Sequence, residues 1–164
     1  INRLDQNTSG LVIFCKTYEA LKKYNKMMRK REIKKFYLCI VHGVVKKEGE
    51  IKGYLVKDSK KNVVIISDTN YDGNRQFIHT KYKPLKIINN HYTLLEIEIL
   101  TGRTHQIRAS LSKINHPIIG DTKYGGKKIH NITTQVLHAY KLIIGDKVII
   151  KESRQINELI INLS

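Results

Sequence analysis

The chain has 164 residues, 41% of them hydrophobic, which is enough for one compact domain with a core and too little for two domains of ordinary size. Thirty Lys and Arg against fourteen Asp and Glu give a formal net charge of +16. Basic residues spread along the whole chain favour a polyphosphate partner, although Lys used as a solubilising residue gives the same composition. No run approaches the roughly 18 apolar residues of a transmembrane helix, so we expect a soluble protein without a membrane partner.

The first residues contain neither an initiating Met nor the apolar core of a signal peptide, and we expect the chain to be a fragment of a longer protein. Cys15 and Cys39 each lie inside an apolar run, where a thiol usually serves as a small hydrophobic group. This pattern fits a reducing, cytoplasmic compartment. Two cysteines without C-x-x-C spacing give no support for a structural zinc site.

Residues 10–16 form a short, apolar, partly β-branched run, which predicts a buried strand. A helix is expected next, with Thr17 as its N-cap and Glu19 in its first turn. Its apolar residues recur at helical spacing: Ala20, Leu21, Tyr24 and Met28. We assign the methionine pair at 27 and 28 to the core, whereas the basic end of this helix suits the helix dipole as well as it suits RNA.

From residue 34 onward strand patterns dominate, at 35–43, 50–56, 62–67, 77–87 and 92–100, separated by polar turns at 57–62 and 70–74. A second helix is predicted from about 104 to 114, with Ile107, Leu111 and Ile114 on one face. Two further strands are predicted near 136–144 and 147–151, before a segment from 156 to 163 that fits helix or strand. The expected class is α+β, with a few helices packed on a mixed, mostly antiparallel sheet.

Three polar clusters interrupt this apolar framework. In the first, residues 2–10, Asp5 alone is best explained as a turn or capping residue. In the second, residues 101–108, arginines at the start of a helix suit a phosphate or carboxylate, but a surface turn with incidental charges is the simpler explanation. In the third, residues 116–125, His116 and Asp121 suggest a metal site, yet no third ligand lies at a suitable spacing. We therefore expect no metal.

Five motifs in this chain resemble, in the same order, those of the RluA-type pseudouridine synthases. They are Arg3-Leu4-Asp5-x-x-Thr8-Ser9-Gly10-Leu11, Lys35-Phe36-Tyr37 leading to Val41-His42-Gly43, residues 101–108, His116-Pro117-Ile118-x-Gly120-Asp121-x-x-Tyr124-Gly125, and Leu137-His138-Ala139. Any one of these segments can arise by chance, but an ordered set of five is very specific to the family. The chain thus resembles this family over almost its whole length.

The resemblance implies a role for several residues. Asp5 matches the catalytic aspartate, Tyr37 the aromatic residue that packs against the target base, and Arg108 the basic residue that pairs with the aspartate. Arg3 matches the arginine that helps to hold the place of the extruded nucleotide. Whether Asp5 acts as a nucleophile or as a base stays open. Both roles require an ionised Asp5, and we expect Arg108 to orient it by a bidentate contact.

Three positions depart from the family pattern. Asn2 and Ser110 stand where His is common, and Asn115 replaces a frequent Gly. None of them removes a matched catalytic group, although the local RNA contacts at Asn2 and Ser110 stay open. Family members also carry further strands upstream and often an S4-type RNA-binding domain. We therefore expect residues 1–164 to be a partial catalytic domain.

The reaction that the resemblance implies, isomerisation of uridine to pseudouridine in structured RNA, gains and loses no atoms and needs no cofactor. Large-subunit ribosomal RNA is the expected target, with tRNA as an alternative, and we expect a monomer. The expected RNA contacts are Arg3, Arg103, His105, Gln106, Arg29, Lys30 and Arg31. Two other readings compete: a non-catalytic RNA-binding protein on the same fold, and a hydrolase that uses Asp5 with His105, which lacks a complete catalytic set.

Overall fold

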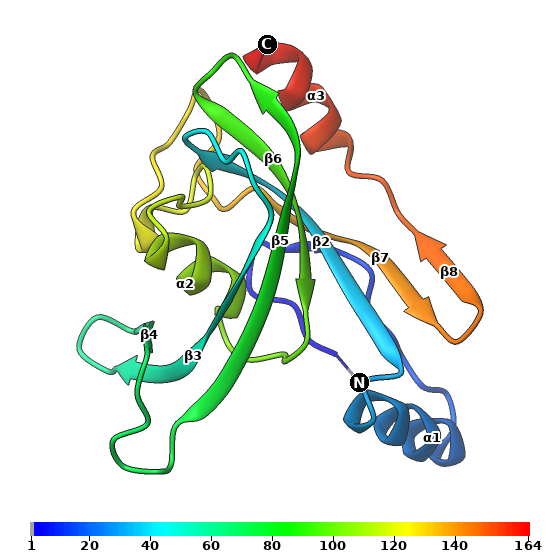
Figure 1. The fold of residues 1–164 in the computed structure, drawn as a ribbon. Coiled ribbons are helices and arrows are strands. Elements are labelled where there is room, and N and C mark those ends of the chain that lie inside the picture. The colour runs from blue at the N-terminus through cyan, green and yellow to red at the C-terminus, as the bar shows by residue number, and fades with distance from the viewer. Residues whose placement is uncertain (1) are drawn as a thin grey trace.

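The computed structural model describes residues 2–164 and contains one eight-stranded sheet with helices at its margins (Figure 1). The strands are β1 (Ser9–Gly10), β2 (Ile33–His42), β3 (Gly49–Asp58), β4 (Val63–Ser67), β5 (Gln76–Ile88), β6 (Tyr92–Ile99), β7 (Leu137–Ile144) and β8 (Lys147–Ile150). The helices are α1 (Tyr18–Arg29), α2 (Gln106–Lys113), α3 (Arg154–Leu163) and a 3-10 turn, η1 (Thr122–Tyr124).

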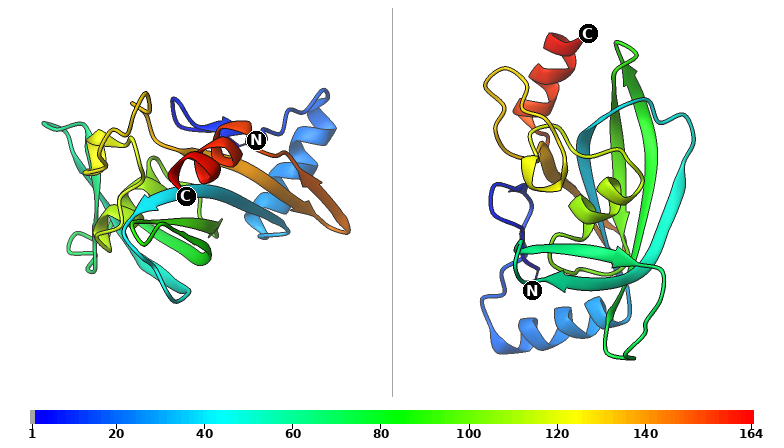
Figure 2. Two further views of the ribbon diagram at one scale, coloured as in Figure 1. Left: turned by 90° about the horizontal axis from the view of Figure 1, so that it is seen from above. Right: turned by 90° about the vertical axis from the view of Figure 1, so that its left-hand side faces the viewer.

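The strands follow the order β1-β7-β2-β6-β5-β3-β4, with β8 paired to β7. β1 runs parallel to β7, and the other paired strands are antiparallel. This confirms the predicted α+β class with a mixed, mostly antiparallel sheet. The right-hand view of Figure 2 shows α2, the loop that follows it and the N-terminal segment on one side of the sheet. We call this the inner side.

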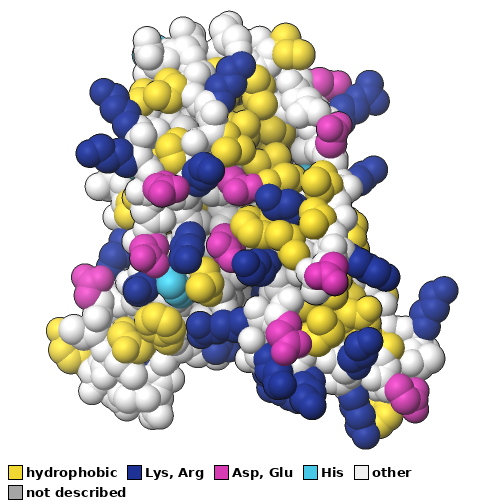
Figure 3. Space-filling view, turned by 45° about the vertical axis from the view of Figure 1, so that its right-hand side comes forward, with side chains coloured by type: hydrophobic (Ala, Val, Ile, Leu, Met, Phe, Trp, Pro, Cys, Tyr) yellow, Lys and Arg dark blue, Asp and Glu magenta, His cyan; other side chains and the backbone are white. Residues whose placement is uncertain are grey.

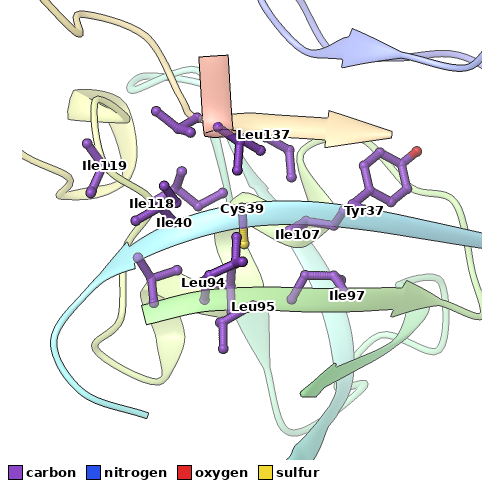
Figure 4. Close-up of a cluster of buried hydrophobic side chains, with 14 of the residues drawn as sticks. Tyr37, Cys39, Ile40, Leu94, Leu95, Ile97, Ile107, Ile118, Ile119 and Leu137 are labelled. Atoms are coloured by element: carbon purple, nitrogen blue, oxygen red, sulfur yellow. The ribbon is translucent and has the colours of Figure 1, made fainter. Parts of the chain in front are cut away.

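The core lies between the central strands and the segments on the inner side. Its largest cluster includes Cys39, Leu95, Ile107, Leu111 and Leu137, drawn in part in Figure 4. α2 is buried over six of its eight residues, Gln106 to Leu111. Because α2 is enclosed in this way, the polar side chains that it carries are held in fixed positions.

The predicted buried strand at 10–16 is wrong. β1 covers only two residues, and beyond the bond from Leu11 N–H to Ala139 O the chain leaves the sheet, with Phe14 87% exposed. The reason lies in β7, whose edge next to β1 is occupied by β8 from Lys141 onward. Residues 11–15 therefore have no free strand to pair with, however apolar they are.

α1 begins as predicted, because the Thr17 side chain accepts a hydrogen bond from Ala20 N–H at 3.2 Å. The assignment of its methionines to the core is wrong, since Met27 and Met28 are half-buried and none of residues 18–29 is buried. The segment that fitted helix or strand is α3, which starts with a Ser153 cap and packs its apolar face into the core.

Candidate active site

Asp5 lies in a tight turn whose hydrogen bond comes from the backbone and not from its side chain. Thr8 N–H donates to Asp5 O at 3.0 Å, and Asn7, at φ 65°, occupies the left-handed position that this turn requires. Within residues 2–164 the Asp5 carboxylate accepts no hydrogen bond, and its side chain is 24% exposed. The explanation of Asp5 as a capping residue therefore does not hold, and its carboxylate is available to a ligand.

The Asp5 loop is held against β7 by side chains that are distant in sequence. The Gln135 amide donates to Gln6 O at 2.6 Å. His138 Nε2 lies 2.8 Å from Lys151 O, a carbonyl that can only accept, so Nδ1 accepts the proton of the Ser9 hydroxyl at 2.7 Å. These bonds fix the ends of the loop and leave its tip facing α2.

Arg108 extends from α2 and is bound at two points by Asp121, in the loop after the helix. Arg108 Nε donates to Asp121 Oδ2 at 2.7 Å, and Nη2 donates to Oδ1 at 2.8 Å. Both side chains are buried, and the guanidinium also lies 4.9 Å from the centre of the Tyr124 ring. Burial acts to lower the pKa of Arg108, but the hydrogen bonds and the charge of Asp121 outweigh it and raise that pKa.

The expectation of a bidentate contact between Arg108 and Asp5 is therefore wrong. Arg108 forms its bidentate contact with Asp121. The remaining nitrogen, Nη1, lies 3.9 Å from Asp5 Oδ2, which is an ion pair without a hydrogen bond. Asp121 takes the two nitrogens of the guanidinium fork and fixes the plane of the group. Arg108 thus presents one fixed donor toward a carboxylate that stays free.

Tyr37 packs in the core and is 6% exposed. Figure 4 shows it at the end of the hydrophobic cluster, with its hydroxyl turned away from the other labelled side chains. Burial, and secondly the negative charge of Asp5, raises the pKa of Tyr37 to about 12. Tyr37 and Asp5 are therefore neighbours. Because Tyr37 is so buried, little of its surface is open to a ligand.

His105 is fixed by Tyr124. Val64 N–H donates to the Tyr124 hydroxyl at 3.0 Å, and that hydroxyl lies 2.8 Å from His105 Nδ1. The hydroxyl satisfies its own donor by giving its proton to Nδ1, and in this arrangement the His105 proton is on Nε2. Burial, and then Arg108, lowers the pKa of His105, so the neutral ring is favoured. His105 makes no hydrogen bond to Asp5 within residues 2–164, which disfavours the hydrolase reading.

Two residues of the helix are supports and not RNA contacts. The Gln106 amide donates to His79 O and Thr80 Oγ1 and accepts from Thr101 Oγ1 and Arg103 N–H. Gln106 is 2% exposed, so its assignment as an RNA contact is wrong. Ser110, where the family often has His, is fully buried against Thr80.

The other two departures have local explanations. The Asn2 side chain accepts from Ile13 N–H at 2.9 Å and so links the two ends of the loop that contains Asp5. Asn115 has φ 62° at the end of α2, a conformation that Asn tolerates better than most residues. It can therefore take the place of Gly there.

The remaining predicted RNA contacts are exposed: Arg3, Arg103, Arg29, Lys30 and Arg31. Arg3 and Arg103 flank Asp5 and α2, whereas the other three lie at the end of α1. Figure 3 shows Lys and Arg spread over the face that it presents, around a central band of hydrophobic side chains.

Sequence reasoning missed Asp121 and Tyr124 as parts of this site. Both belong to the motif at 116–125, where Asp121 was considered only as a metal ligand. In the described residues no group of three or more His, Cys, Asp and Glu could hold a metal, and His116 Nδ1 instead contacts His42 O at 2.8 Å. None of the helices among residues 2–164 is long and apolar enough to cross a membrane.

Comparison with known proteins gives a consistent result. Residues 1–113 match the family model described as RNA pseudouridylate synthase. The chain is 36% identical over 154 residues to a ribosomal large subunit pseudouridine synthase C from Rickettsia bellii, covering 93% of this chain and 50% of that protein. It is 41% identical over 145 residues to an uncharacterized RNA pseudouridine synthase from Helicobacter pylori, covering 88% and 57%. The chain thus spans about half the length of the curated relatives that it matches.

Solved structures show the same fold. Human RNA Pseudouridylate Synthase Domain Containing 4 superposes with a TM-score of 0.80 at 20% identity, over 98% of this chain and 73% of that one. Human RNA Pseudouridylate Synthase Domain Containing 1 gives 0.78 at 23% identity, over 93% and 67%. With the family model matched over most of its length, this chain belongs to the RNA pseudouridylate synthase family.

Proposed function

We propose that this chain is the catalytic domain of an enzyme that isomerises uridine to pseudouridine in structured RNA, with Asp5 as its catalytic carboxylate. One observation carries the assignment of Asp5: its carboxylate accepts no hydrogen bond from residues 2–164 and lies 3.9 Å from a buried arginine that a second carboxylate already orients. A residue kept for structure alone would be expected to satisfy its carboxylate within the protein.

The parts of the site suit the steps of this reaction. The bond between the ribose anomeric carbon and ring nitrogen N1 breaks, the base turns, and the ribose is rejoined to C5, which loses its proton as N1 gains one. Asp5 acts on the ribose as a nucleophile or as a base. Arg108 directs that carboxylate, and the side chain of Tyr37 limits where the base can lie.

The substrate follows from charge and from the relatives. The Rickettsia bellii relative is named for the large ribosomal subunit, and we propose large-subunit ribosomal RNA as the target, acted on in the cytoplasm. The target uridine must leave its stack, which costs a few kcal/mol in a duplex and less in a loop. In this proposal Arg3 and Arg103 hold the RNA backbone beside Asp5, and Arg29, Lys30 and Arg31 extend this contact without reading sequence.

Substitution of Asp5 tests this function. Asp5→Asn in the full-length protein is expected to abolish pseudouridine formation in ribosomal RNA taken from cells that lack the protein, and to leave RNA affinity within a few-fold. Asp146→Asn, in the exposed turn between β7 and β8, is the matched control and should keep full activity. Pseudouridine formed by Asp5→Asn would refute the role of Asp5. An inactive wild-type protein that still binds RNA would favour a binding protein.

A further inference from the structure

The buried charges of this protein do not balance. In the part of the chain that the structure describes, the buried Lys, Arg, Asp and Glu side chains are Lys35, Arg108 and Asp121. Arg108 and Asp121 bind each other. Lys35 is 9% exposed, and its ammonium group makes neither a hydrogen bond nor an ion pair with any described residue. Burying an unpaired ammonium costs free energy, so its retention calls for an explanation.

The register of the sheet directs Lys35 to the inner side. Lys35 on β2 pairs with Ile99 on β6, and Ile99 pairs with Thr80 on β5. Directly paired residues point to the same side of a sheet. The Thr80 hydroxyl contacts Gln106 and Ser110 of α2. Lys35 therefore points toward α2, as does Tyr37, two residues further along β2 and about 7 Å away.

The ammonium group of Lys35 reaches the loop that leads into α2. A Cβ added to Gly102 would lie 3.2 Å from Lys35 Nζ and would meet nothing else within 4 Å. The neighbour of Gly102 is the exposed Arg103. No side-chain nitrogen or oxygen of the described residues is both fully buried and unpaired, so Nζ keeps an opening to solvent. Gly102 thus leaves room above a cation whose stem is buried and whose tip is accessible.

We propose that Lys35 binds a phosphate oxygen of the RNA, at a nucleotide next to the target uridine. This inference rests on the proposed function for its ligand. A phosphate carries a permanent negative charge and compensates the unpaired ammonium, which the neutral uracil of the target does not. Burial lowers the pKa of Lys35 in the free protein, and a bound phosphate opposes that shift. Lys35 positions the RNA strand and takes no part in bond breaking.

Small ligands separate a phosphate contact from a contact with the base. We expect Lys35→Met to weaken binding of uridine 3′,5′-bisphosphate at least five-fold in an NMR titration and to leave uridine binding unchanged. Lys83→Met is the matched control. Lys83 is exposed, and its side chain points to the opposite side of the sheet from Thr80 and Tyr82. It should behave as wild type. Equal loss of affinity for uridine and for the bisphosphate, or no loss for either, would overturn the proposal.

Stability separates a binding role from a structural one. Lys35→Met keeps the buried stem and removes an unpaired charge, so its melting temperature without RNA should equal or exceed that of wild type. A clearly lower melting temperature would show that Lys35 supports the fold and would overturn the proposal. The nucleotide titration does not depend on turnover, so it can be interpreted even if the wild-type protein forms no pseudouridine. The absence of pseudouridine would refute only the proposed function.

A stem-loop RNA with an unpaired uridine gives a third measurement. Removal of one phosphate contact should reduce the slope of log affinity against log salt by about one. We expect this reduction in Lys35→Met relative to Lys83→Met. An unchanged slope in Lys35→Met would contradict a phosphate contact in RNA.

Discussion

Arg108 gives two of its guanidinium nitrogens to Asp121 and leaves the third 3.9 Å from Asp5. The two carboxylates have different surroundings. The Asp121 side chain is 1% exposed and takes both hydrogen bonds, whereas that of Asp5 is 24% exposed and takes none from the described residues. One arginine therefore holds a buried ion pair and also faces the carboxylate that we propose to be catalytic. This arrangement allows the two functions to be separated by substitution.

Asp121→Asn is expected to destabilise the fold strongly. It leaves Arg108 buried without its charge partner, a change that typically costs about 3–5 kcal/mol. Urea unfolding followed by circular dichroism measures it. The matched substitution Asp72→Asn breaks an exposed ion pair with Arg75 and should cost less than about 1 kcal/mol. A similar small cost for Asp121→Asn would mean that the pair with Arg108 does not hold the fold.

Arg108→Lys should reduce the rate of pseudouridine formation by about 100-fold or more while the chain stays folded. A lysine is a single point charge and cannot bind Asp121 with a fork and face Asp5 at the same time, and a small misplacement of a catalytic group costs about that factor. Single-turnover kinetics measure the change. Arg154→Lys, in an exposed pair with Glu158, is the control. A near-normal rate for Arg108→Lys would contradict this orienting role.

The strands of this protein could be predicted from its sequence to within two or three residues at their ends, because polar turns and β-branched runs are local signals. The error at 10–16 shows the limit of such signals. An apolar run predicts burial, but whether a neighbouring strand is free to pair depends on β8, more than 130 residues further along the chain. No pattern within the run contains that information.

The candidate site, like the fold, could be predicted from the sequence only in part. Ordered motifs mark Asp5, Tyr37 and Arg108 as candidates, and the structure brings these three residues to one side of the sheet. Which carboxylate binds the arginine fork could not be predicted, since Asp5 and Asp121 are both motif residues and only the path of the loop after α2 decides between them. The prediction of Gln106 as an RNA contact has a related difficulty. Its position in the motif suited RNA, but the helix turns its side chain inward toward Thr80.

The ionisation of Tyr37 should report on Asp5. The absorbance difference between wild type and Tyr37→Phe at alkaline pH should show one tyrosine with a pKa of about 12. Asp5→Asn removes a negative charge that disfavours tyrosinate, so it should lower the pKa of Tyr37, whereas Asp146→Asn should not change it. An unchanged midpoint in Asp5→Asn would mean that the two residues are not neighbours.

The same group makes a contribution to stability that depends on pH. The folded-state pKa of Tyr37 lies above its ordinary value of 10.0, so the folded protein retains a proton that the unfolded chain loses. Its contribution is complete below pH 10 and is lost as the pH rises toward about 12. Tyr37→Phe should make the fall in unfolding free energy over this range less steep. Parallel curves for wild type and Tyr37→Phe would contradict the raised pKa.

Tyr124→Phe tests whether one hydroxyl sets the state of His105. The substitution leaves Val64 N–H without its partner and removes the proton donated to His105 Nδ1. We expect a stability loss of about 1–3 kcal/mol and, in nitrogen-15 NMR spectra, a change of His105 from a single tautomer with its proton on Nε2 to a mixture. Tyr71→Phe, at an 82% exposed residue, should alter neither. If Tyr124→Phe keeps the single tautomer, another group fixes His105, and the link from β4 through Tyr124 to the start of α2 does not control the site.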